Sequence, residues 1–170
     1  VLQSRGLGDV YKRQVFDNGE IAASGGTSGV IYSITNDINS KEPSRINHFA
    51  HVNYNDNNKS IGKLLCINGA GIQYRWLRNH SVGKSYEKMN EAASSIPVGS
   101  EGISVIPFGN GAERMLNNKN IGTHICNINL NQHSHGHLYR SSLEGIAFSF
   151  MYGMETVSYT HLRAHETARH

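Results

Sequence analysis

The sequence predicts an α/β layer fold. Strand hairpins come first and are followed by helices that alternate with strands, an order typical of that class. The chain has 170 residues, enough for one ordinary domain, of which 38% are hydrophobic and 17% charged. This composition excludes a disordered chain and a coiled coil. No apolar run approaches the ~20 residues of a membrane span, and no N-terminal stretch has the layout of a secretory signal.

Two strand pairs are predicted in the first 70 residues. An apolar run at 20–24 and a β-branched and aromatic run at 30–34 flank the Gly-rich segment 25–29. Two short strands around such a turn predict a β-hairpin. Residues 48–54 and 63–68 predict another pair of strands.

Three helices follow. The first covers residues 69–79, with Ile72 and Trp76 on one face. Ser85 is the expected N-cap of the second, which extends to Ser95. Its predicted inner face holds Tyr86, Met89 and Ala93.

The last helix has the clearest pattern. Apolar residues recur at a spacing of 3–4, which predicts one continuous apolar stripe. The stripe consists of Tyr139, Leu143, Ile146, Phe150 and Met154. Between the second and third helices, residues 102–108 predict a buried strand.

The charge and the cysteines exclude further classes of protein. The net charge of +3 lies entirely in residues 1–14 and 156–170, and the segment between them is neutral. The basic balance therefore does not indicate nucleic-acid binding. Cys66 and Cys126 are too few for a disulfide scaffold, so a reduced, cytoplasmic compartment is expected.

The two ends have an unusual relation at the level of DNA. One DNA segment, read in opposite senses, can encode both residues 4–14 and residues 157–166. It resembles the adapter of transposon-based sequencing libraries, so we expect 1–14 and 156–170 to be translated adapter and set them aside. Residues 15–155 are then the biological segment, cut at both ends.

Two glycine-rich segments are candidate binding sites. In Gly25-Gly26-Thr27-Ser28-Gly29, exposed N–H groups and hydroxyls suit a phosphate, although an ordinary hairpin turn has the same pattern and no P-loop motif is present. In Asn68-Gly69-Ala70-Gly71-Ile72-Gln73, a helix N-terminus offers N–H groups to an anion. Close packing of helix on strand is the alternative there.

Other polar residues have simpler interpretations. Glu113 and Arg114 are a catalytic pair or, more commonly, a structural ion pair. His133, His135 and His137 precede the last helix without an evident carboxylate partner, so a solvated helix entrance is expected rather than a metal site. Cys66 and Cys126 are expected in the core, and Glu144 and Glu155 on the helix surface.

Four segments in order carry a family resemblance: IAASGGTSGVIYSI, LLCINGAGIQYRWLRN, YEKMNEAASSIPVGSEGISVIPFGNGAERML and HLYRSSLEGIAFSFMYGME. Together they resemble the C-terminal domain of FGGY-family carbohydrate kinases over nearly all of 15–155. The resemblance implies a ribonuclease-H-like, actin-like ATPase domain, here truncated. It also implies ATP-dependent phosphorylation of a sugar hydroxyl, with greatest likeness to members that convert D-xylulose to D-xylulose 5-phosphate.

The resemblance also implies site residues. The family's phosphate turn matches Gly26 and Thr27, with Ser28 and Gly29 following, and its Gly-x-x-x-Gln nucleotide contact matches Gly69 and Gln73. Mg²⁺ would neutralise the phosphates. The Gly-Glu-Arg loop corresponds to Gly111–Arg114, with an inserted Ala and no assigned role. The family's catalytic Asp would lie upstream of the chain, and Asp17 does not match its motif.

The expected partners are ATP and a small sugar, with no nucleic acid and no membrane, and a homodimer is an expectation for the complete enzyme. Because the base and the sugar-binding domain would be missing, we expect no kinase activity from the 170 residues alone. The alternatives are a kinase of the same family for another polyol or sugar acid, and a non-catalytic actin-like nucleotide-binding module.

Overall fold

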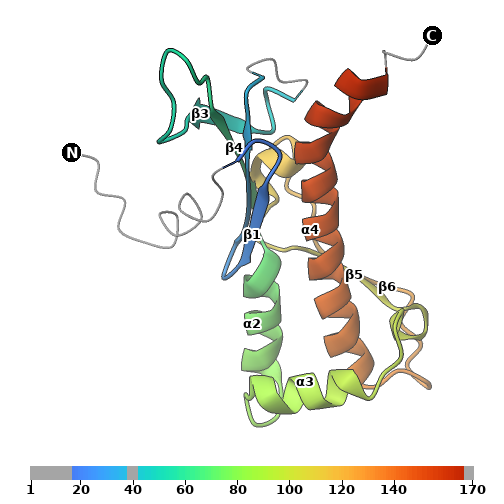
Figure 1. Ribbon diagram of the computed structural model, residues 1–170. Helices are drawn as coiled ribbons and strands as arrows, with labels where there is room; N and C mark the ends of the chain where they lie inside the picture. The colour runs from blue at the N-terminus through green and yellow to red at the C-terminus, as the bar shows by residue number, and fades with distance from the viewer. Residues whose placement is uncertain (1–16, 38–41, 167–170) are drawn as a thin grey trace.

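The structure is a computed structural model that describes residues 17–37 and 42–166, with side chains to residue 158 (Figure 1). A four-stranded antiparallel sheet has the order β1-β2-β4-β3. The predicted hairpin is confirmed, with Gly25 opposite Gly29 at its closed end. The predicted second pair is also confirmed. The strands are β1 Ile21–Gly25, β2 Gly29–Thr35, β3 Asn47–Ala50 and β4 Ile61–Ile67.

Three helices and a smaller hairpin follow the sheet. Helix α2 continues directly from the sheet, and α3 lies across the ends of α2 and α4 (Figure 1). The helices are α2 Ala70–His80, α3 Tyr86–Ser94 and α4 His135–Glu166. The smaller hairpin is β5 Ser104–Phe108 with β6 Gly122–Cys126, accompanied by short 3₁₀ helices at Ser100–Gly102 and Glu113–Leu116.

Helix α4 packs on the sheet through small residues together with part of the predicted apolar stripe, since Ile146 and Phe150 pack against the main core. The buried side of α4 includes Ser142, Gly145, Ser149 and Gly153. These small residues allow the helix to lie close to its neighbours, and a Cβ on Gly145 would overlap the carbonyl oxygen of Val105. The predicted stripe is confirmed for Tyr139, Ile146 and Phe150, which lie in or against the core clusters, whereas Leu143 and Met154 are exposed.

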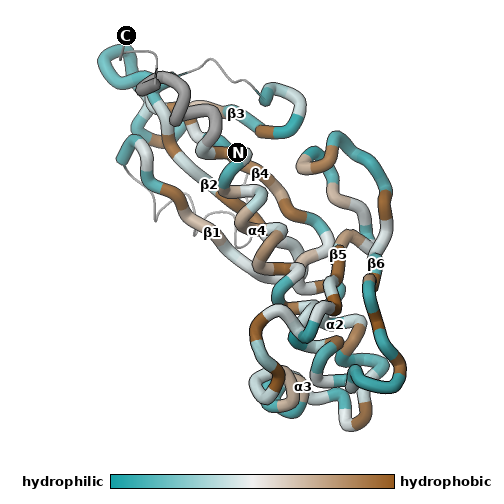
Figure 2. The backbone as a smooth tube through the Cα atoms, turned by 90° about the vertical axis from the view of Figure 1, so that its right-hand side faces the viewer, coloured by the Kyte–Doolittle hydropathy of each residue, from teal (hydrophilic) through white to brown (hydrophobic). Residues whose placement is uncertain are grey.

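The main core lies between α4 and the hydrophobic stretches of β2 and β4, which Figure 2 shows along the strands. A second cluster joins the three helices through Tyr74, Leu77, Met89, Ala93 and Tyr139. Ser85 caps α3 as predicted, its hydroxyl accepting from the Lys88 N–H. Met89 and Ala93 face inward as predicted, but Tyr86 is exposed.

Two strand predictions need correction. The segment predicted as a buried strand alternates between exposed and buried residues in β5, because only one face of this hairpin is covered. Strand β6 is absent from the sequence prediction. The alternation of Ile121, Thr123 and Ile125 is the signal that indicates it.

Of the two proposed boundaries of the biological segment, only the one between residues 155 and 156 lies within the described residues. Residues 1–14 lie outside the described residues. Helix α4 runs across the boundary between residues 155 and 156, and Val157 is fully buried against the main core. Within the described part of the chain, no helix is long and apolar enough to cross a membrane.

Candidate functional site

The hairpin turn Gly26–Ser28 meets the first turn of α2. The Ile72 N–H donates to the Thr27 carbonyl oxygen at 3.0 Å. Gly71 allows this approach, because a Cβ there would overlap the Gly26 carbonyl oxygen. The first two sequence-predicted segments, 40 residues apart, therefore form one junction. One of the helix N–H groups expected to face an anion is used by the turn itself.

Asn68 connects this junction to a third segment. The Ser28 hydroxyl donates to Asn68 Oδ1 at 3.1 Å, and Asn68 Nδ2 donates to the Asn110 carbonyl oxygen at 3.3 Å. The amide thus joins the hairpin turn to the loop that follows β5. Gly69 comes next, with a φ of 91° in the left-handed region and its Cα packed on the Pro107 carbonyl. Close packing, the alternative stated for this segment, is therefore present here.

A cavity of about 630 Å³ opens between α2 and the β5–β6 hairpin. The face shared by Ile72 and Trp76 is not a core face: it lines this cavity, and Trp76 is 56% exposed. The opposite wall includes Asn110, Thr123 and Ile125. The sequence prediction missed Thr123 and Ile125 because it did not include β6.

Gln73 is buried at the edge of the cavity. It is only 5% exposed, and its Nε2 lies 3.4 Å from the Ser142 hydroxyl of α4. Its Oε1 is buried without a hydrogen-bond partner among the described residues. A buried acceptor left unpaired costs about 1–3 kcal/mol. Gln73 therefore lines the cavity with an acceptor that the described residues leave unpaired.

The residues predicted for phosphate lie in a separate hollow. Gly26 and Thr27 line a space of about 320 Å³ on the other side of the first turn of α2, together with Tyr86 and Phe150. Gly26, Thr27 and Ser28 are exposed there. Gly29 is buried instead, with no room for a Cβ beside the Phe150 ring. Of the predicted contacts, Gln73 lines the cavity, and Gly26 and Thr27 line the adjoining hollow.

The predicted Glu113–Arg114 pair is not formed. Both side chains are exposed, and no ion pair joins them within the described part of the chain. Cys66 and Cys126 are unpaired thiols at partly buried positions, not full core positions. Burial, with Glu113 nearby, raises the pKa of the Cys66 thiol. The thiol therefore stays protonated near neutral pH and is a poor nucleophile.

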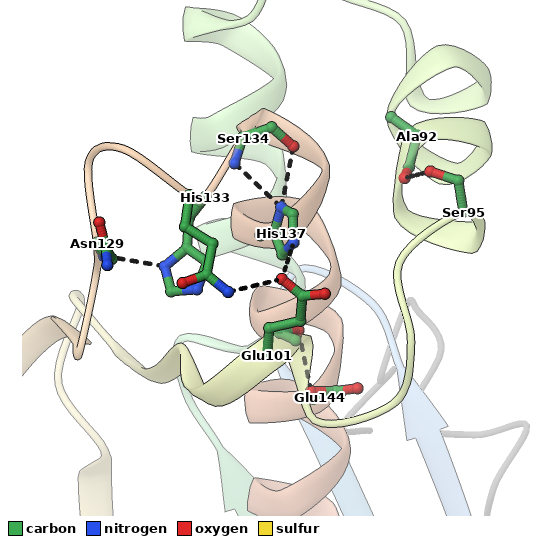
Figure 3. Close-up of polar contacts among 10 residues, drawn as sticks. Ala92, Ser95, Glu101, Asn129, His133, Ser134, His137 and Glu144 are labelled. Carbon is green, nitrogen blue, oxygen red and sulfur yellow. Dashed lines mark hydrogen bonds and ion pairs between the residues drawn. The ribbon is translucent and has the colours of Figure 1, made fainter.

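The histidines at the start of α4 differ from the prediction, since His135 and His137 lie within its first turn (Figure 3). His137 is 8% exposed rather than solvated, and it does have a carboxylate partner. The Ser134 N–H donates to His137 Nδ1 at 3.0 Å, which leaves Nε2 to donate to Glu101 Oε2 at 3.1 Å. No group of three or more His, Cys, Asp or Glu in the described residues is placed to hold a metal.

Glu144 is likewise not a simple surface charge. Its carboxylate accepts from the Gly99 N–H at 2.9 Å, the Ser100 hydroxyl at 3.2 Å and Arg140 Nε at 2.7 Å. Burial would raise the pKa of Glu144, but these hydrogen bonds more than offset burial, and the pKa is lowered. Glu101 and Glu144 therefore hold the loop before β5 against α4.

The arrangement defines a fold class: it is the ribonuclease-H-like fold of actin-like ATPases, which solved structures of sugar kinases share. The crystal structure of xylulose kinase from Rhodospirillum rubrum matches with a TM-score of 0.76 at 18% identity. The match covers 89% of this chain and 30% of that one. The fold predicted from the sequence is confirmed.

Individual protein sequences are also similar to this chain, and they too are carbohydrate kinases. A xylulose kinase from Haemophilus influenzae is 27% identical over 76% of this chain and 25% of its own length. A gluconokinase from Bacillus subtilis is 26% identical over 88% of this chain and 29% of its own length. The chain thus spans about a quarter of the length of these relatives. No protein-family model matches the sequence. The resemblance to FGGY-family carbohydrate kinases is confirmed.

Proposed function

We propose that this chain is the nucleotide-binding part of an ATP-dependent carbohydrate kinase. The observation that carries the proposal is the junction where the Gly26–Ser28 turn, the first turn of α2 and the loop after β5 meet beside a cavity. Phosphoryl transfer depends mainly on positioning and on electrostatic stabilisation of the phosphates. A junction of backbone N–H groups and hydroxyls beside a nucleoside-sized cavity supplies part of both.

The cavity suits the nucleoside. Ile72, Trp76 and Ile125 provide apolar walls for a base, and polar side chains such as Gln73 and Thr123 lie among them. Ligand pockets of this kind are mostly apolar with a small number of orienting polar groups. Gln73 Oε1 is the buried acceptor that a hydroxyl or amino group of the nucleoside would satisfy.

The hairpin turn suits the phosphates. Thr27 is exposed and lines the adjoining hollow, where its hydroxyl would serve a phosphate. Mg²⁺ would come with the nucleotide and be held mainly by phosphate oxygens. We assign Gly26, Thr27, Ser28 and Gly29 to the phosphate side and Gly69 and Gln73 to the nucleoside side, with Gly29 supporting the turn through packing.

For the sugar we propose D-xylulose, converted to D-xylulose 5-phosphate in the cytoplasm. The xylulose kinases among the relatives support this choice, and the gluconokinase supports a sugar acid as the second candidate. The test is to recover the genomic reading frame across both ends and assay its product with Mg·ATP and each sugar. Turnover of D-gluconate without turnover of D-xylulose would reverse the choice.

Nucleotide binding can be tested on the chain itself. Trp76 is the only tryptophan in the sequence and lines the cavity, so its fluorescence reports directly on an occupant. Titration with Mg·ATP should give a saturable change, and adenosine should give a weaker one. Absence of any saturable change with either molecule would contradict the proposed function.

Thr27 separates the phosphate contribution from the nucleoside contribution. Thr27→Val removes one hydroxyl beside the phosphates and should weaken ATP binding by about tenfold, the value of one hydrogen bond to a charged group. Adenosine affinity should change by less than about twofold. Thr27→Ser keeps the hydroxyl and is the matched control. Equal losses for ATP and adenosine would remove Thr27 from the phosphate site.

A further inference from the structure

Arg75 is the one described residue that lines both hollows. It belongs to the lining of the cavity with Gln73 and Trp76, and to the lining of the hollow with Gly26 and Thr27. It is exposed on α2, one turn beyond Gly71. A single cationic side chain therefore lines both the cavity beside Gln73 and the hollow beside Thr27.

Arg75 also lacks an internal role for its charge. No carboxylate lies within ion-pair distance of it in the described part of the chain. Arg78, three residues on, differs in this respect: its guanidinium lies 4.5 Å from the centre of the Tyr86 ring and donates to Asn79. Arg78 is thus engaged in packing α2 on α3, whereas Arg75 is not.

A cation at this position answers a requirement that the other residues leave unmet. The Gly26–Ser28 turn and the first turn of α2 offer neutral donors only, while a nucleoside triphosphate brings several negative charges. Arg presents planar donors that match phosphate oxygens in a bidentate geometry. The long side chain can reach toward either hollow from its place between them.

We propose that Arg75 binds the polyphosphate of the nucleotide and links the nucleoside cavity to the Thr27 turn. The proposal rests on the proposed function for the identity of the ligand, and it adds a residue that the sequence prediction did not include. Arg75 is a binding and positioning residue here, with no part in proton transfer.

The test is calorimetric binding of Mg·ATP and of adenosine to the 170-residue chain and to Arg75→Met. Loss of a charge-assisted hydrogen bond should weaken ATP binding about 10- to 100-fold, with adenosine binding changed by less than about twofold. The salt dependence of ATP binding should also become shallower, because one phosphate contact is lost. Arg75→Lys should restore part of the affinity, since it keeps the charge but not the fork of donors.

Arg78→Met is the matched control on the same helix. We expect it to lower thermal stability but to leave the ratio of ATP affinity to adenosine affinity unchanged. An unchanged ratio in Arg75→Met would overturn the inference while leaving the proposed function standing. Failure of the unsubstituted chain to bind ATP would overturn the proposed function. In that case, inorganic tripolyphosphate tests separately whether Arg75 binds phosphate. It should bind the unsubstituted chain and not Arg75→Met. Equal binding to both proteins would refute the phosphate-binding role of Arg75.

Discussion

The two ends of β5 are held in different ways. At its start, the carboxylates of Glu101 and Glu144 hold the preceding loop against α4, and the strand itself lies on Gly145 without space for a Cβ. At its end, Phe108 lies in the main core, and only the largely exposed loop 109–111 beyond it borders the cavity, with the Asn110 carbonyl accepting a neutral hydrogen bond from Asn68.

This difference indicates that the segment before β5 anchors the strand to α4, whereas the loop after β5 is available for ligand binding. Hydrogen bonds to charged groups contribute about 1.5–3 kcal/mol each, against about 1 kcal/mol for neutral ones. Segments with fewer buried contacts open at lower free energy, and binding loops come from that part of a structure. We therefore expect substitutions at the start of β5 to change mainly stability, and those in the largely exposed loop 109–111 to change mainly ligand affinity.

The largest effect on stability is expected from Gly145→Ala. Helix propensity alone would favour Ala by about 1 kcal/mol. The overlap of the new Cβ with the Val105 carbonyl should outweigh this gain and destabilise the protein by about 2 kcal/mol, in the range for overpacking. Urea unfolding measures the difference. Ala147→Gly, at an exposed position of the same helix, is the control for propensity, and a more stable Gly145→Ala protein would show that β5 is not anchored there.

Glu144→Gln should have a smaller effect that depends on pH. The folded pKa of Glu144 lies below its ordinary value of 4.5, so its charge contributes stability above about pH 4.5 and loses it as the pH falls through the lower folded pKa. At pH 7 we expect a loss of about 1–2 kcal/mol. The difference in the free energy of unfolding between the original protein and Glu144→Gln should become smaller as the pH falls below about 4.5.

The same pH range includes Glu42, whose pKa is lowered by its hydrogen bond with Arg45. Glu42 remains in both proteins, so the difference between the original and Glu144→Gln isolates Glu144. Glu91→Gln, at an exposed position on α3, should change stability by less than about 0.5 kcal/mol. A difference that stays constant from pH 7 to pH 3 would contradict the role given to the Glu144 carboxylate.

The smallest effect on stability is expected from Asn68→Ala, below about 1 kcal/mol. Its consequence should be local: amide exchange at Gly111, bonded to the Phe108 carbonyl, and at Gly26, bonded to the Ser28 carbonyl, should accelerate together. Ser28→Ala should accelerate exchange at Gly26 alone. Slow exchange at Gly111 in Asn68→Ala would mean that the end of β5 is held by something other than this amide.

The sequence predicted those features of the structure that depend on interactions between residues close together in the chain. The hairpin turn at 25–29 and the Ser85 cap were predictable because a glycine-rich turn and a capping hydroxyl act within four residues. The burial of the small residues of α4 was not, because it is set by how closely the sheet and β5 approach the helix. Gly145 and Ser149 permit an approach that larger residues would prevent, so the small side is buried and Leu143 remains exposed.

The candidate site shows the same limit. Its glycine-rich segments and Gln73 were identified from local pattern and from resemblance, but β6 and Arg75 were not, since exposed short strands and surface cations have weak patterns. Likewise, spacing in the sequence gives no reason to pair His137 with Glu101, which lies 36 residues before it.

Local chemistry in the sequence by itself determined where the chain turns and where its helices begin, and four ordered motifs determined the resemblance to sugar kinases. Only the tertiary structure decided which side of α2 faces the cavity, that two hollows meet at Arg75, and that Glu144 is a structural anchor. The physical reason is that turns and caps depend on neighbours along the chain, whereas cavities, buried charges and close helix contacts depend on segments brought together by folding.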